Sequence, residues 1–191
     1  LAVVLNYTCH PTCVTGENRL VSAEYCGYAT AAVEQATGAI TLFITGAIGD
    51  VGPARRGWDV LEQIGGAVAT EALRLLPEIA VADWGRLHAV HQSIALPLQP
   101  LPTEEALNQT LAEIQQNLAN PELMQQPYQP QIQGAMLAWA TTTLDQVSTG
   151  RAAPTVTTEL QVLRIGDLAL VSAPGELFVE YQLAAKALRP D

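Results

Sequence analysis

Positive charge is scarce in this chain of 191 residues. Lys186 is its only lysine, and lysine and arginine together number 9, against 19 aspartates and glutamates. The formal net charge is therefore −10, and the sequence contains no basic cluster. Nucleic acids and anionic membranes attract proteins through clustered Lys and Arg, so the composition argues against both as partners. A neutral or lipid-like substrate remains compatible with it.

Long apolar runs and cysteines are also few. No apolar run reaches the roughly 18 residues expected of a transmembrane helix. Three cysteines, Cys9, Cys13 and Cys26, are too few and odd in number for a disulfide framework. Cys9 and Cys13 flank His10, but a zinc knuckle needs a further Cys or His at close spacing, and we interpret the cysteines as buried side chains. Hydrophobic residues make up 49% of the chain, which argues against general disorder.

The first part of the chain alternates between two kinds of pattern. Short, apolar, β-branched segments at 1–6 and 40–45 predict buried strands. Helical patterns follow them at 22–37, with Ser22 as the expected N-cap and Gly38 as the expected end, and at 58–76. This order predicts an α/β fold with a mixed, partly parallel sheet and flanking helices.

The middle of the chain is rich in glutamine. Residues 103–150 are predicted to form a helical insertion, with helices at 103–118 and 133–147. Thr103 is the expected N-cap of the first helix. Residues 120–130, rich in Pro and Gln, are expected to form an irregular loop between the two.

The remaining elements surround this insertion. A strand is expected at 87–98, and two further strands at 155–165 and 168–172. The Gly166-Asp167 pair between the latter two is a strong hairpin signal. A helix is expected at 177–188 after the turn Ala173-Pro174-Gly175-Glu176.

His10 lies just after the first expected strand, in the segment Cys9-His10-Pro11-Thr12. Ligands of open α/β sheets bind at the carboxyl ends of strands. Pro11 biases the preceding residue toward an extended conformation, which restricts His10 and suits a ligand. The alternative from this segment alone is a loop histidine that bonds to the backbone.

Two other strand ends carry candidate groups. The glycine-rich turn from Gly46 to Pro53 has backbone amides suited to an oxyanion, and Asp50 is placed to orient a ligand or a water. Its alternative is a tight strand–helix connection. Glu176 lies at the start of an expected helix, and a helix N-terminus favours the ionised carboxylate that a metal requires. The alternative is that Glu176 is simply a first-turn acid of that helix.

Taken in order, these segments resemble the N-terminal domain of the neutral/alkaline non-lysosomal ceramidase family. The resemblance covers nearly the whole chain and is weakest between about 103 and 150. The segments that carry it are Asn-Tyr-Thr-Cys-His-Pro-Thr at 6–12, Leu-Val-Ser-Ala-Glu-Tyr at 20–25, Leu-Phe-Ile-Thr-Gly-Ala-Ile-Gly-Asp-Val-Gly-Pro at 42–53, and Val-Ser-Ala-Pro-Gly-Glu-Leu-Phe at 171–178.

The resemblance implies a zinc-dependent amidase that cleaves the N-acyl bond of a lipid-like substrate. His10 and Glu176 match zinc ligands of the family, so Zn²⁺ is the expected cofactor. The family's other two ligands, a histidine upstream and a tyrosine downstream, fall outside these residues. We therefore expect residues 1–191 to be part of a single catalytic domain that is truncated at both ends and inactive alone. The resemblance is compatible with a secreted or periplasmic location, and the sequence leaves the location open.

Gly52 departs from the family pattern, which has a catalytic serine at this position. Glycine cannot act as a nucleophile or carry a proton. A metal-activated water needs no serine, and Asp50 with the backbone of Gly49 and Gly52 is then expected to position the substrate or the oxyanion. Two alternatives stay open: a non-catalytic relative that binds lipid, glycan or protein, and a metallo-hydrolase of another bond, such as an ester.

Overall fold

The computed structural model describes residues 2–14, 16, 18–80, 85–150 and 155–188. It confirms the predicted α/β class, with helices, a parallel strand pair and an antiparallel sheet. The chain forms two compact units, one of residues 1–90 with 161–191 and the other of residues 91–160. The predicted insertion, 103–150, lies within the second unit. We describe each unit by itself.

The first unit contains the parallel strands β1 (Ala2–Tyr7) and β2 (Ile40–Thr45). Their register runs from Ala2 opposite Ile40 to Tyr7 opposite Thr45. Helix α1 (Glu24–Thr37) joins them, as parallel neighbours require a crossover. The parallel strand pairing that the sequence predicted is therefore present, as a two-stranded sheet of its own, and both strands end at the same edge.

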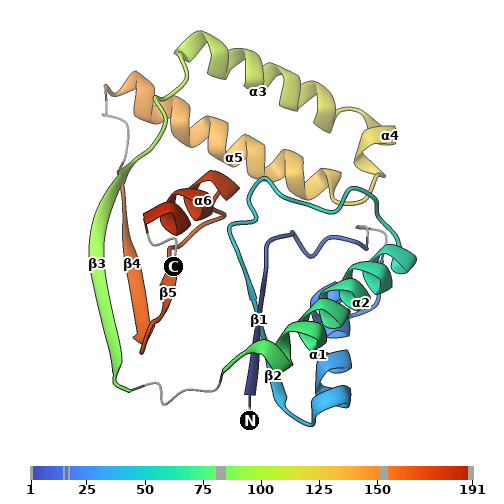
Figure 1. Ribbon diagram of the computed structural model, residues 1–191. Coiled ribbons are helices and arrows are strands. Elements are labelled where there is room, and N and C mark those ends of the chain that lie inside the picture. The colour runs from blue at the N-terminus through green and yellow to red at the C-terminus, as the bar shows by residue number, and fades with distance from the viewer. Residues whose placement is uncertain (1, 15, 17, 81–84, 151–154, 189–191) are drawn as a thin grey trace. The chain divides into compact units, whose positions relative to one another are not determined.

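The core of this unit lies on one face of the strand pair. Val3 and Leu5 of β1 are buried, whereas Val4 between them is 50% exposed. Helix α1 and helix α2 (Trp58–Leu75) lie next to the strand pair (Figure 1). Both contribute side chains to the core that contains Val3 and Leu5. The expectation of a fully buried strand was thus wrong, since side chains alternate along a strand and the two helices pack on one face. The helical residues buried in this core are Ala29, Val33 and Ala69.

The ends of helices α1 and α2 follow local capping rules, with one difference from the prediction, at Ser22. Gly38 ends α1 with φ +68°, as predicted for a C-terminal glycine. At the other end the N-cap is Ala23, not Ser22, and the helix begins at Glu24. The Ser22 hydroxyl still accepts a hydrogen bond from the Glu24 amide, at 3.0 Å. Helix α2 gives way to a 3₁₀ turn, η1 (Leu76–Glu78), where the sequence has Pro77.

A three-stranded antiparallel sheet follows, in the order β3–β4–β5. Its strands are β3 (Leu87–Pro97), β4 (Thr155–Ile165) and β5 (Leu168–Ser172). Ile165 pairs with Leu168 across the hairpin, and Gly166 in the turn has φ +58°. The hairpin signal is confirmed. The chain then reaches α6 (Val179–Leu188), two residues later than predicted.

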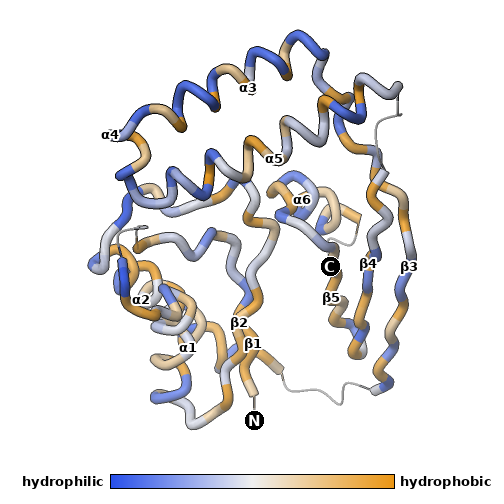
Figure 2. Tube along the Cα trace, turned by 180° about the vertical axis from the view of Figure 1, so that it is seen from behind, coloured by the Kyte–Doolittle hydropathy of each residue, from blue (hydrophilic) through white to orange (hydrophobic). Residues whose placement is uncertain are grey.

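The second unit is built around a helical hairpin. Helix α3 (Glu104–Leu118) packs against α5 (Gln129–Ser148), and Leu107 and Ile114 of α3 are buried. The Thr103 side chain accepts from the Ala106 amide at 3.2 Å, which confirms it as the N-cap. Much of α3 is hydrophilic, whereas β1 and β2 are mostly hydrophobic (Figure 2).

The expected irregular loop at 120–130 is only partly irregular. A short helix, α4 (Pro121–Met124), forms there, and α5 begins at Gln129. Asn120 starts α4 because its side-chain oxygen accepts from the amides of Glu122 and Leu123, at 3.0 and 3.3 Å. Pro121 follows at the first helical position, where its missing N–H costs nothing. Within the described ranges, none of the helices combines the length and the apolarity needed to cross a membrane.

Candidate functional site

His10 lies just beyond the end of β1 and is fixed through both its backbone and its ring. Its amide donates to the carbonyl of Val51 at 2.8 Å. Its ring Nδ1 lies 2.8 Å from the carbonyl oxygen of Ile48. A carbonyl only accepts, so Nδ1 carries the proton and, in the neutral ring, Nε2 keeps a free lone pair. The glycine-rich turn thus sets the orientation and the tautomer of His10.

Glu176 reaches the same place from the other end of the chain. Its Oε1 lies 3.7 Å from His10 Nε2, and its side chain is 73% exposed, against 28% for His10. The preceding Gly175 has φ +99°, a conformation that favours glycine. Because α6 begins at Val179, Glu176 precedes the helix and is not a first-turn acid. The tertiary structure therefore brings together the two residues predicted as metal ligands.

Asp50 faces α6. Its Oδ1 accepts a hydrogen bond from the backbone amide of Val179 at 2.8 Å. That amide is the first of the helix and has no partner within it. One carboxylate oxygen of Asp50 therefore caps α6, so the residue that the sequence predicts to position substrate also anchors a helix.

The two glycines of the predicted substrate-binding turn have different surroundings. The Gly49 amide donates to the Leu177 carbonyl at 2.8 Å, and a Cβ at Gly49 would collide with the Glu176 carbonyl oxygen. Gly49 therefore permits close approach of the two backbones, and its amide is occupied. A Cβ at Gly52 would meet only the Cβ of His10, at 4.0 Å. Gly52 consequently leaves open space beside His10.

Two polar side chains next to the site were not predicted. Thr8 Oγ1 donates to Gln182 Oε1 at 2.9 Å, and the Ala47 amide donates to the same oxygen at 2.8 Å. Nothing in the local sequence marks Gln182, because its partners come from strand ends far away in the chain. Thr8 directly precedes the Cys-His-Pro-Thr segment, and this position is the sequence signal that could have indicated its role.

The cysteines near His10 are packed into the core, as predicted. Cys9 and Cys13 are buried, and Cys26 is partly buried. Burial, followed by a hydrogen bond to Glu24, raises the pKa of the Cys13 thiol to about 12. Burial is also the main cause that raises the pKa of Cys9 and of Tyr25, whose hydroxyl donates to the Cys9 carbonyl. These groups are therefore neutral near pH 7, and Cys9, Cys13 and Tyr25 pack together in one buried cluster.

The side chains at this site fit part of the ligand set of a zinc ion. In the described part of the chain, no group of three or more His, Cys, Asp or Glu side chains is placed to hold a metal. His10 and Glu176 form a pair of the nitrogen and oxygen donors that zinc accepts, and bonds of about 2.1 Å to each can span their separation. The carbonyl of Ile48 on Nδ1 is the kind of partner that metal-ligating histidines have.

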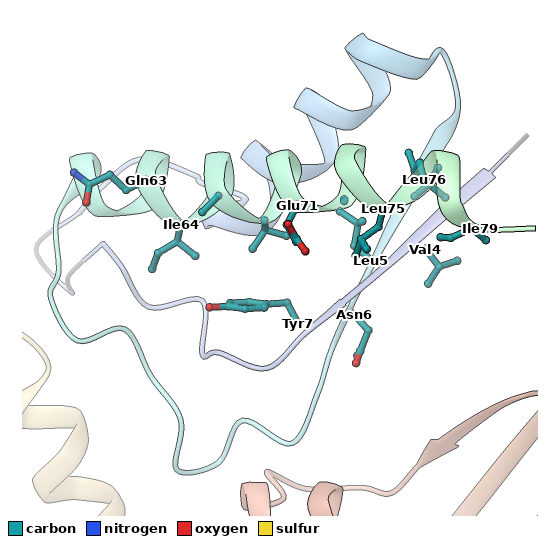
Figure 3. A pocket seen from close by; sticks show the side chains of 14 residues that line it. Val4, Leu5, Asn6, Tyr7, Gln63, Ile64, Glu71, Leu75, Leu76 and Ile79 are labelled. Atoms are coloured by element: carbon teal, nitrogen blue, oxygen red, sulfur yellow. The ribbon is translucent and has the colours of Figure 1, made fainter. Parts of the chain in front are cut away.

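An apolar cavity of about 530 Å³ lies elsewhere in the first unit, between β1 and α2 (Figure 3). Val4, Leu5 and Tyr7 line it from the strand, and Ile64 and Leu75 from the helix. None of His10, Asp50 or Glu176 borders it. We therefore place the candidate site at the strand ends and not in this cavity.

Comparisons of the chain with protein-family models, with curated proteins and with solved structures find no match. The features that bear on function are therefore the residues at the strand ends and the resemblance of their motifs.

Proposed function

We propose that this chain belongs to a zinc-dependent hydrolase that cleaves the N-acyl amide bond of a lipid-like substrate. One observation carries the proposal: His10 presents Nε2 toward the Glu176 carboxylate, at 3.7 Å, while Ile48 holds its Nδ1. The resemblance to ceramidases supplies the reaction class. The acidic composition, with net charge −10, agrees with a neutral rather than an anionic substrate.

Each residue has a defined part in this proposal. His10 offers a lone pair and Glu176 an anionic oxygen, so together they provide two of the four zinc ligands that the resemblance implies. When bound, zinc supplies a Lewis acid that activates water and polarises the carbonyl of the substrate. Gly52 leaves room beside His10 for the substrate group that is attacked. A reaction in which water is the nucleophile requires no serine at that position.

The zinc content of the longer protein that the resemblance implies tests the assignment. We expect about one zinc per wild-type molecule by elemental mass spectrometry, and a loss of zinc in His10→Ala and in Glu176→Gln. His91→Ala is the matched control, since His91 of β3 pairs with Glu159 of β4, at 2.8 Å, and not with Glu176. It should keep its zinc. One full equivalent of zinc in His10→Ala would overturn the proposal.

Residues 1–191 alone should bind zinc weakly and be inactive, because they supply only two ligands.

A second candidate function is a non-catalytic protein that binds lipid, glycan or another protein through the same site. Gly52 favours it, because no side chain at that position faces His10. A substrate screen with N-acyl lipids, N-acyl amino compounds and matched esters separates the candidates. Amide turnover that disappears in His10→Ala supports the amidase. Ester turnover alone indicates a hydrolase of another bond, and bound zinc without turnover of any substrate supports the binding protein.

A further inference from the structure

The chain around Glu176 depends on contacts from other segments. The Glu176 side chain is 73% exposed, and α6 after it has no buried residue in its described part. Phe178 is 54% exposed and Tyr181 64% exposed, so apolar burial does little to hold this part of the chain. Its position opposite His10 must therefore come from polar contacts.

Two of those contacts are made by the backbone that directly follows Glu176. The Gly49 amide donates to the Leu177 carbonyl, and Asp50 Oδ1 accepts from the Val179 amide, both at 2.8 Å. The Gly49 amide and the Asp50 carboxylate both belong to the glycine-rich turn. The same turn provides the Ile48 carbonyl that bonds to the His10 ring. The turn thus contacts both members of the His10–Glu176 pair.

Gln182 joins all three segments through one atom. Its Oε1 accepts from Thr8 Oγ1 at 2.9 Å and from the Ala47 amide at 2.8 Å. Thr8 lies two residues before His10, and Ala47 directly precedes Ile48. A side-chain amide oxygen has two lone pairs, so both bonds are satisfied at once. Gln182 is only partly exposed, unlike most of α6.

The glycine at position 46 makes this arrangement sterically feasible. A Cβ at Gly46 would collide with both Gln182 Oε1 and Thr8 Oγ1. The space that a side chain would take is therefore filled by the amide of Gln182. This close fit ties the position of α6 to the ends of β1 and β2.

We propose that Gln182 is a positioning residue that holds Glu176 opposite His10, with Asp50 as its partner at the start of α6. Gln182 fixes α6 to the segments that carry His10 and Ile48, and Asp50 fixes the first amide of the helix. Together they restrict the Pro-Gly-Glu turn, so that Glu176 can serve as a ligand with His10. The role in ligation rests on the proposed function, whereas the anchoring of α6 does not.

The test compares Gln182→Met, which keeps the length of the side chain but loses the strong acceptor, with Gln182→Glu, which keeps an acceptor oxygen. Gln109→Met is the matched control, because Gln109 is an exposed glutamine of α3 whose side-chain amide donates to Glu113 of the same helix at 3.2 Å. Hydrogen exchange reports on anchoring without any metal. Zinc affinity of the longer protein that the resemblance implies, measured by competition with a chelating dye, reports on the ligand pair.

In Gln182→Met we expect amide exchange at Ala47, Gly49 and Val179 to rise about tenfold or more, while the amides between β1 and β2 stay unchanged. Zinc affinity should fall about 10- to 100-fold, the usual effect of losing a group that orients a ligand. Gln182→Glu should restore both properties, and Gln109→Met should alter neither.

The outcomes separate the two proposals. Unchanged exchange at Ala47 and Val179 in Gln182→Met overturns the anchoring role of Gln182. Faster exchange with unchanged zinc affinity overturns its role in placing Glu176. If the wild-type protein binds no zinc, the proposed function fails, while faster exchange that Gln182→Glu reverses still supports the anchoring of α6.

Discussion

His10 uses its two ring nitrogens for different purposes. Nδ1 donates to the Ile48 carbonyl, and Nε2 faces Glu176. His91 also pairs with a glutamate, Glu159, but does so through Nδ1, and its side chain is 72% exposed. Of these two histidines, His10 is therefore the one whose Nε2 is directed at a carboxylate while Nδ1 is held by a backbone carbonyl. This difference makes His91→Ala an informative control for zinc binding.

A prediction at the residue scale concerns Cys13. Burial raises the pKa of its thiol to about 12, from 9.0 for a free thiol. Because the folded pKa is raised, the stability that the neutral thiol contributes is complete below pH 9 and is lost between pH 9 and about 12. The loss from one thiol reaches about 1.4 kcal/mol per pH unit in that window.

Urea unfolding at pH 8 and at pH 10 measures this effect. Wild-type protein should lose stability between the two pH values, and Cys13→Ala should lose less, although it is less stable at pH 8 because of the cavity it creates. The comparison uses the change with pH and not the absolute stability. Equal pH-dependent losses in the two proteins would contradict the prediction.

At the scale of elements, the site is made where several segment ends meet. β1 and β2 are parallel, so the chain leaves both at one edge, and α6 begins at the same edge through the contacts of Asp50 and Gln182. Gly46 and Gly49 allow this close approach, since a Cβ at either would collide with the facing segment. These glycines have a packing role beyond the turn that they form.

A second prediction concerns the α3–α5 hairpin. Ile114 is 1% exposed and Leu118, one turn later on α3, is 39% exposed. Ile114→Ala should destabilise the hairpin by about 2 to 5 kcal/mol because it leaves a cavity, and Leu118→Ala should cost much less. Urea unfolding followed by the fluorescence of Trp139 on α5 measures both. Equal effects of the two substitutions would show that Ile114 is not packed as described.

For the whole molecule, the charge balance decides which partners are accessible. The net charge is −10, and 9 basic residues face 19 acidic ones. We expect no binding to duplex DNA or to phosphatidylglycerol vesicles at physiological salt, because both carry negative charge. Fluorescence anisotropy and vesicle sedimentation measure this, with zwitterionic phosphatidylcholine vesicles as the comparison. Salt-sensitive binding to either anionic partner would contradict the prediction.

Local sequence rules were successful where one segment was enough to decide the structure. Gly38 predicts the end of α1, Thr103 the start of α3, and Gly166-Asp167 the hairpin, because each acts on neighbouring backbone groups. The errors arose where neighbours compete. Ser22 was expected as an N-cap but α1 begins at Glu24, and the loop at 120–130 contains α4 because Asn120 caps it.

The candidate site was predictable in its members but not in its geometry. In the sequence, strand-end placement and motif order predict His10, Asp50 and Glu176 as site residues. The sequence could not show that Asp50 caps α6, that the Gly49 amide is taken by Leu177, or that Gln182 connects the segments. Each of these contacts joins residues more than a hundred positions apart, and local propensity carries no information about such pairs.

Periodicity, capping and composition indicate the α/β class, most element positions and the scarcity of positive charge, because they act locally or add over the chain. The proposed ligands come instead from the strand-end placement of His10 and Glu176 and from the resemblance of their motifs to a family. It takes the folded structure to show that His10 and Glu176 meet, which ring nitrogen of His10 faces the carboxylate, and what holds Glu176 there. Those features depend on the parallel pairing of β1 with β2 and on the anchoring of α6 at their shared edge. Such an arrangement forms only when distant segments pack together.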